Sequence, residues 1–194
     1  MNNPVLILYL EDNPRDAELV RDRLKLIAMP HELRVASDRA EYEAALAQTR
    51  FDLILSDYTL PNYDGMAALA LARVVQPDVP FILISGTLGD EQAVDCVLRG
   101  ATDYVLKQRL DRLMPAVLRA LTEAEERRKR REAEESVRYS EIRYRRLFEA
   151  AQDGILIRDA EPEMVVDVNP FLVQLLRKMS LKLGRHSKYC LVWL

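Results

Sequence analysis

The chain has no long apolar run and few cysteines. None of its hydrophobic stretches reaches the roughly 18 residues that a membrane-spanning helix needs, so no membrane segment is expected. The N-terminus lacks the basic start and small-residue cleavage site of a signal peptide. The cysteines, Cys96 and Cys190, lie far apart and fit no metal-binding or redox spacing. These absences predict a cytoplasmic protein.

An excess of basic charge is also missing. The chain has 28 Lys and Arg residues against 31 Asp and Glu residues, which gives a formal net charge of −3. This balance argues against a nucleic-acid-binding surface over the whole molecule. One basic block, residues 127–131, is flanked by acids, so a solvated helix is the better interpretation. No C-terminal helix-turn-helix is evident, and we expect no nucleic-acid partner.

Up to about residue 122, short apolar segments alternate with amphipathic ones. Strands are expected near residues 4–10, 32–36, 52–57, 80–85 and 103–107. Helices are expected near residues 14–28, 38–49, 64–76, 89–99 and from about 110. This alternation implies right-handed crossovers and a parallel sheet. Because the strands lack polar–apolar alternation, helices should cover both faces. The sequence therefore predicts an α/β fold with a doubly wound, five-stranded parallel sheet.

Polar residues follow four of these apolar runs. Glu11 and Asp12 follow the first run, Asp57 ends the third, Ser85 ends the fourth and Lys107 ends the fifth. Each alone has an ordinary explanation, such as a helix cap, a turn residue or a surface lysine. These separate explanations do not account for the combination. The carboxyl ends of parallel strands lie along one edge of the sheet, where such folds bind ligands, so these polar residues should lie near one another.

This set of residues suits phosphoryl transfer. A carboxylate such as Asp57 can attack phosphorus and form an acyl phosphate. A Mg²⁺ ion, or Mn²⁺ in its place, would offset the repulsion between that carboxylate and a phosphoryl dianion. Mg²⁺ takes few protein ligands, so a small acidic cluster suffices. Lys107 and Ser85 would then contact other phosphoryl oxygens.

Residues 4 to about 122 resemble the receiver domain of two-component response regulators. The matching segments are Glu11-Asp12, Leu55 to Pro61 around Asp57, Asp64-Gly65, Ile84-Ser85-Gly86, Gly100 to Tyr104, and Lys107. The resemblance implies a flavodoxin-like sheet with strand order 2-1-3-4-5. It also implies a phosphoacceptor that is not an enzyme, with a histidine kinase or phosphotransfer protein as its partner.

The resemblance further implies roles for individual residues. Asp57 would be the phosphoacceptor. Asp12 and Asp57 would bind Mg²⁺ directly, Glu11 through water, and Thr59 through its backbone carbonyl. Ser85 and Tyr104 would form a switch pair that changes position on phosphorylation.

One position departs from the family pattern. Members usually have a proline after the lysine, with a cis peptide there, whereas this chain has Gln108. A cis bond before a non-proline residue costs roughly 3 kcal/mol. We therefore expect a trans peptide, and the path of the segment that carries Lys107 becomes a question for the structure.

Three regions are expected along the chain: the receiver domain at 1–122, a charged helical linker at 123–143, and a partial PAS-like segment at 144–194. The linker contains no glycine or proline, and its acidic and basic residues are spaced for pairing along a helix. It predicts a helix, with a coiled coil and a homodimer as an alternative to a solvated monomer.

The segment from Tyr144 to Leu176 is similar to the opening of a PAS sensor domain. The matching text is Arg146 to Ile155 and Val168-Asn169-Pro170-Phe171. The resemblance covers about the first half of such a domain. The tail from Arg177 looks unrelated, as a truncated or frame-shifted sequence would.

A second function class stays open at this point. Aspartate-nucleophile phosphatases use a similar α/β sheet and place Asp-x-Asp at the end of the first strand, where this chain has Glu11-Asp12-Asn13. Turnover separates the two hypotheses, because a receiver stores one phosphoryl group whereas a phosphatase processes many substrate molecules.

Overall fold

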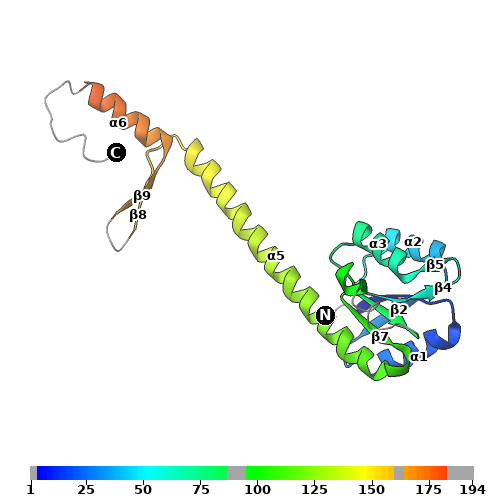
Figure 1. The fold of residues 1–194 in the computed structure, drawn as a ribbon. Helices are drawn as coiled ribbons and strands as arrows, with labels where there is room; N and C mark the ends of the chain where they lie inside the picture. The colour runs from blue at the N-terminus through cyan, green and yellow to red at the C-terminus, as the bar shows by residue number, and fades with distance from the viewer. Residues whose placement is uncertain (1–3, 87–94, 160–163, 183–194) are drawn as a thin grey trace. The chain divides into compact units, whose positions relative to one another are not determined.

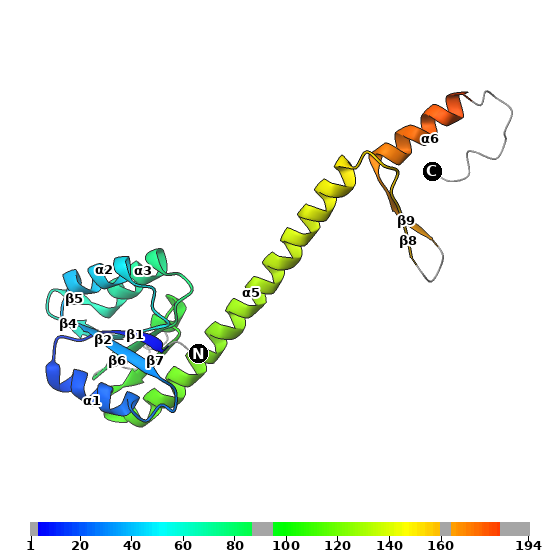
Figure 2. The same ribbon diagram turned by 180° about the vertical axis from the view of Figure 1, so that it is seen from behind.

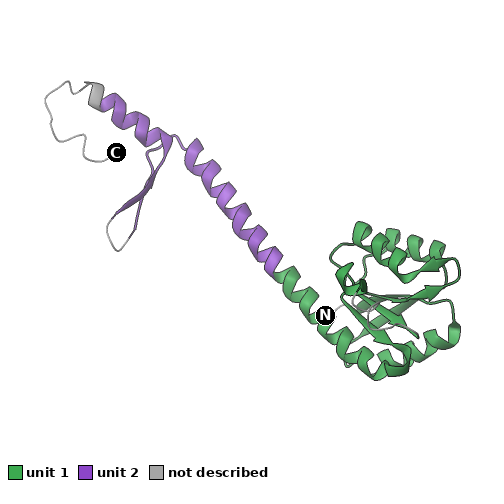
Figure 3. Ribbon diagram, in the orientation of Figure 1, with its two compact units in different colours: residues 1–129 green, residues 130–194 purple. Residues whose placement is uncertain are grey.

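The computed structural model describes residues 4–86, 95–159 and 164–182 (Figure 1). The chain divides into two compact units, residues 1–129 and residues 130–194 (Figure 3). No helix in the described ranges combines the length and the apolar character that crossing a membrane requires.

The first unit is built on a parallel sheet. Its strands are β1 (Val5–Leu10), β2 (His31–Ala36), β3 (Leu53–Asp57), β6 (Phe81–Ser85) and β7 (Asp103–Leu106). They lie in the order β2-β1-β3-β6-β7, and all four neighbouring pairs are parallel. Since β6 and β7 are the fourth and fifth strands of this sheet along the chain, the expected order 2-1-3-4-5 is confirmed.

Helices cover both faces of the sheet. They are α1 (Pro14–Leu24), α2 (Arg39–Gln48), α3 (Gly65–Val75) and the first part of α5 (Leu113–Ala150). Figures 1 and 2 show α2 and α3 on one side of the sheet and α1 with the start of α5 on the other. The helix expected near 89–99 begins outside the described residues, and residues 95–98 are helical.

Helix starts follow the sequence signals, but α1 ends earlier than expected. The Asn13 side chain accepts a hydrogen bond from the Arg15 amide, and Pro14 occupies the first turn. The helix was predicted to reach residue 28 but ends at Leu24. Beyond it the amides of Leu26 and Ile27 bond to carbonyls three residues back, a tighter turn that breaks the α-helical ladder.

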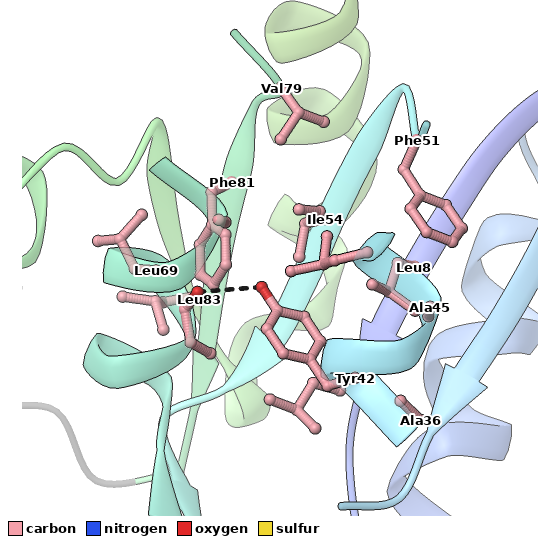
Figure 4. Close-up of a cluster of buried hydrophobic side chains, with 14 of the residues drawn as sticks. Leu8, Ala36, Tyr42, Ala45, Phe51, Ile54, Leu69, Val79, Phe81 and Leu83 are labelled. Carbon is pink, nitrogen blue, oxygen red and sulfur yellow. Dashed lines mark hydrogen bonds between the residues drawn. The ribbon is translucent and has the colours of Figure 1, made fainter. Parts of the chain in front are cut away.

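The side chains of successive strand residues point to opposite faces of the sheet and pack into two separate hydrophobic cores. On β1, Ile7 and Tyr9 pack with α1 and α5, whereas Leu8 and Leu10 pack with α2 and α3. All four are fully buried. Figure 4 shows the second core, where the Tyr42 hydroxyl donates to the Ala68 carbonyl at 3.0 Å. This bond satisfies a polar group that the apolar surroundings would otherwise penalise.

A short hairpin that the sequence did not predict follows β3. It joins β4 (Thr59–Leu60) to β5 (Tyr63–Asp64), with Asn62 in a left-handed conformation at φ 61°. Gly65 follows at once, and a Cβ built there would lie 2.6 Å from the Asp57 carbonyl oxygen and 2.5 Å from the Leu83 side chain. Only glycine fits this close approach. Gly65 therefore lets α3 start directly against the end of β3.

The second unit holds the later part of α5, an antiparallel pair and a final helix. α5 is continuous over 38 residues, which confirms a helix through 123–143. Strands β8 (Leu156–Arg158) and β9 (Val165–Val168) pair, and α6 (Pro170–Lys182) follows. The buried Asn169 side chain joins these parts by bonding to the Ile155 and Leu172 amides.

Candidate functional site

Three carboxylates meet at the carboxyl edge of the parallel sheet. Glu11 and Asp12 follow β1 directly, and Asp57 is the last residue of β3. Each offers a carboxylate oxygen, and these atoms lie within 4.8 Å of one another. Glu11 and Asp57 are buried, whereas Asp12 is exposed and opens the cluster to solvent. The convergence expected from the strand ends is therefore present.

Lys107 contacts two members of this cluster, Glu11 and Asp57. It begins the 3₁₀ helix η1 (Lys107–Arg112) immediately after β7. Its Nζ donates to Glu11 Oε2 and Asp57 Oδ2, each at 2.9 Å, and to Asp16 Oδ2 at 2.6 Å. Burial alone would lower the pKa of this ammonium, but the hydrogen bonds that it donates to Asp16, Asp57 and Glu11 outweigh burial and raise its pKa above the ordinary lysine value.

Gln108 does not divert Lys107 from the site. Its side-chain Nε2 donates to the Gly86 carbonyl at 2.6 Å. Gly86 follows Ser85 at the end of β6, so this bond ties the segment after β7 to the segment after β6. The glutamine side chain thus anchors the turn that carries Lys107.

Two site residues were missed at the sequence level: Asp16 and Tyr9. The Tyr9 side chain is fully buried, and its hydroxyl donates to Glu11 Oε2 at 2.8 Å. Asp16 lies in the first turn of α1, where a role as a helix-dipole acid is a sufficient local explanation, so no signal in the sequence indicates a site role for it. No signal marks Tyr9 either, because it has the pattern of an apolar strand residue.

Burial disfavours the ionised form of Glu11. Desolvation raises its pKa, and this effect exceeds the opposing hydrogen bonds from Lys107, Tyr9 and the Asn13 amide. A nearby cation would favour the ionised form of this carboxylate. The donor set, three carboxylates with one side open, is the kind that Mg²⁺ accepts.

The remaining predicted residues lie around this cluster. Ser85 is buried at the end of β6, next to β3 in the sheet. Tyr104 lies on β7, is partly buried and packs against the core under α2 and α3. Thr59 is exposed at the start of β4, two residues after Asp57. The Tyr58 amide between them donates to Asp57 Oδ1 at 2.7 Å and so fixes that carboxylate.

The arrangement presents the buried Asp57 carboxylate within an acidic cluster, with one of its oxygens, Oδ2, bound to the Lys107 ammonium. Such a carboxylate can act as a nucleophile toward an electrophile that carries negative charge, because the fixed ammonium would offset part of that charge.

Protein-family models match both parts of the chain. The model for the response regulator receiver domain matches residues 7–118, more than half of the chain. A PAS domain model matches residues 142–188. The second match extends past Leu176, where the resemblance was expected to end.

Individual proteins match the first part. Response regulator protein FleR of Pseudomonas aeruginosa is 35% identical over 102 residues, which make up 52% of this chain and 21% of that protein. This chain thus spans about a fifth of the length of the first curated relatives it matches.

Solved structures agree in fold. A CheY-like response regulator receiver domain protein from Methanospirillum hungatei JF-1 superposes with a TM-score of 0.58 at 24% identity, covering 64% of this chain and 99% of that one. A response regulator protein from Burkholderia pseudomallei, with a phosphorylated aspartic acid, calcium ion and citrate, has a TM-score of 0.52 at 25% identity. That match covers 67% of this chain and 74% of that one.

Proposed function

This chain belongs to the response regulator receiver domain family, and from that premise we propose that Asp57 accepts a phosphoryl group from a histidine kinase or a phosphotransfer protein. The observation that carries the proposal is the contact of Asp57 Oδ2 with Lys107 Nζ at 2.9 Å, inside a cluster that also holds Glu11 and Asp12. The family assignment favours this function over the aspartate-nucleophile phosphatase that the sequence left open.

The proposed step is a transfer from phosphohistidine to a carboxylate. An Asp57 oxygen attacks phosphorus, a P–O bond forms, the P–N bond breaks, and its electron pair returns to the imidazole. Lys107 lies where it can neutralise a phosphoryl oxygen as a point charge. Ser85, buried at the end of the neighbouring strand, would donate its hydroxyl to another. The protein contributes mainly positioning and electrostatics, as is usual for phosphoryl transfer.

Receiver domains bind Mg²⁺ at an acidic site, and this chain has an acidic cluster at the corresponding strand ends. We propose that Asp12, Asp57, Glu11 and the Thr59 backbone carbonyl would hold the ion, with Mn²⁺ as a substitute. The bound cation would offset the charge repulsion between Asp57 and the phosphoryl group. The response regulator protein from Burkholderia pseudomallei carries a phosphorylated aspartic acid and a divalent cation, calcium, which supports the proposal that an acceptor aspartate and a divalent ion occur together in this fold.

Ser85 and Tyr104 are proposed as the switch pair. Ser85 lies on β6 beside the acceptor strand, and Tyr104 lies on the next strand, β7. The neighbouring Asp103 connects Tyr104 to α5. Asp103 Oδ1 accepts a hydrogen bond from the Tyr104 amide, and its Oδ2 pairs with Arg119 on α5. A change in the position of Tyr104 would therefore be transmitted to α5.

Beyond the receiver, α5 would act as a linker that pairs with a second copy, and the PAS-like segment would follow it. Apolar side chains that are exposed on this part of α5 support pairing, among them Val137, Ile142 and Leu147. The PAS domain match at 142–188 supports the assignment of the segment at 144–194.

The acceptor role can be tested with acetyl phosphate as donor. Intact mass spectrometry should show one added phosphoryl group on the chain with Mg²⁺ and none with EDTA. Asp57→Asn should show none under either condition. Equal incorporation in Asp57→Asn and the unaltered chain would refute Asp57 as the acceptor.

A further inference from the structure

Among the described residues, Asp16 is the one carboxylate bound to Lys107 that lies outside the acidic triad of Glu11, Asp12 and Asp57. Its Oδ2 lies 2.6 Å from Lys107 Nζ, compared with 2.9 Å for both Glu11 and Asp57. An ammonium has three donors, and the three carboxylates take one each. Lys107 Nζ is therefore held by Asp16 together with the two triad residues.

The local structure makes Asp16 a firm anchor. It sits in the first turn of α1, whose start is set by the Asn13 cap and Pro14. Asp16 and Lys107 border a small cavity of about 30 Å³ whose other walls include Leu19 and Leu110. Their side chains are only 28% and 22% exposed. Because apolar neighbours exclude part of the solvent, this ion pair is screened less than a surface pair.

The other two partners of Lys107 acquire competing duties during phosphoryl transfer. Asp57 gains a phosphoryl group, and both Glu11 and Asp57 belong to the triad that would hold the cation. Asp16 takes on neither duty. Its hydrogen bond to Lys107 can therefore persist from the resting state to the phosphorylated state.

We propose that Asp16 is a positioning residue that holds the Lys107 ammonium in place to meet the incoming phosphoryl group. The proposal rests on the proposed phosphoacceptor role of Asp57. Asp16 touches no reacting atom and acts only through Lys107. It adds to the site a residue that is remote from Lys107 by 91 positions in the sequence.

A purely electrostatic effect would have the opposite sign. Asp16 is a fourth carboxylate near the acceptor, and its negative charge repels a phosphoryl dianion. If repulsion dominated, removing the charge would speed phosphorylation. If positioning dominates, as we propose, removing the carboxylate slows it, because a displaced catalytic group loses much of its effect.

The test uses the full chain, saturating Mg²⁺ and a series of acetyl phosphate concentrations. Asp16→Ala should lower the maximal rate of phosphorylation about tenfold, since a charge-assisted hydrogen bond is lost. Asp16→Asn should lose less, because its amide oxygen can still accept from Lys107. Glu18→Ala is the matched control: Glu18 also lies on α1, but it is exposed and pairs with Arg21. A rate for Asp16→Ala at or above that of the unaltered chain would overturn the proposal.

A second readout needs no phosphoryl donor. With saturating Mg²⁺, which the triad would hold and which would compete for Glu11 and Asp57, NMR relaxation of the Lys107 Cε should show an ordered side chain in the unaltered protein and in Glu18→Ala, and a mobile one in Asp16→Ala. An equally ordered Lys107 in Asp16→Ala would contradict the proposal. Failure of the unaltered chain to accept phosphate at all would instead refute the acceptor function, so the two failures are distinguishable.

Discussion

Lys107 Nζ and Asp57 Oδ2 lie 2.9 Å apart although 50 positions separate the two residues in the chain. The contact forms even though Gln108 stands where the family usually has proline. It is possible because β3 and β7 end at the same edge of the sheet, and because the Gln108 side chain ties the turn after β7 to Gly86.

Replacing Lys107 with alanine should lower phosphorylation by acetyl phosphate by roughly 10- to 100-fold, because one fixed cation at the site is lost. Lys129→Ala is the control, since that lysine is exposed on α5 and pairs with Glu125. Rates of phosphate incorporation measured side by side decide the point. Equal rates in the two variants would argue that Lys107 plays no part in the transfer.

Gly65→Ala should destabilise the receiver by about 1–3 kcal/mol, the usual cost of forcing an extra carbon into a packed site. The new Cβ would lie 2.6 Å from the Asp57 carbonyl oxygen and 2.5 Å from the Leu83 side chain. Urea unfolding measures the change. Gly86→Ala serves as the control, because no atom lies within 4 Å of a Cβ placed there. A Gly65→Ala variant as stable as the control would contradict the close approach.

Mg²⁺ affinity should fall on mild acidification. Burial raises the pKa of Glu11, so this proposed ligand takes up a proton at a higher pH than an ordinary glutamate at about 4.3. Proton and metal compete for the carboxylate, and affinity should decline as pH falls toward that raised value. Calorimetric titration of Mg²⁺ between neutral and mildly acidic pH checks this. Glu11→Gln should bind more weakly and lack this part of the pH dependence; an identical pH profile in the two proteins would assign the effect elsewhere.

The whole chain should associate more strongly than a shortened chain that ends at Thr122. The removed part of α5 carries exposed apolar side chains, including Val137 and Ile142, that a partner helix could cover. Light scattering at matched concentrations should give a larger mass relative to the monomer for the whole chain. If both proteins are monomers, α5 is not an association surface.

Much of the receiver could be predicted because its signals are local. Apolar runs such as Leu53 to Leu55 mark buried strands, and residues such as Asn13 and Asp38 mark helix starts through caps that the structure contains. Once the strands are parallel, topology alone brings Glu11 and Asp57 together. This is why the acidic cluster could be predicted from the sequence.

Other features depend on contacts that sequence spacing does not encode. The two-residue strands β4 and β5 are too short to show periodicity. The end of α1 is set by a change to tighter backbone bonds, although apolar Ile27 continues the helical pattern. Asp16 reaches Lys107 only through the tertiary fold, and its position in a first turn has a sufficient local explanation as a helix-dipole acid.

The most direct test of the account is to locate the acyl phosphate. Borohydride reduces an aspartyl phosphate to homoserine, which peptide mass spectrometry can assign to a position. After treatment with acetyl phosphate and Mg²⁺, homoserine should appear at residue 57 and at no other aspartate, and it should be absent when EDTA replaces Mg²⁺. Homoserine at Asp12 or Asp16 with Asp57 intact, or no homoserine in the presence of Mg²⁺, would contradict the assignment of Asp57 as the phosphoacceptor.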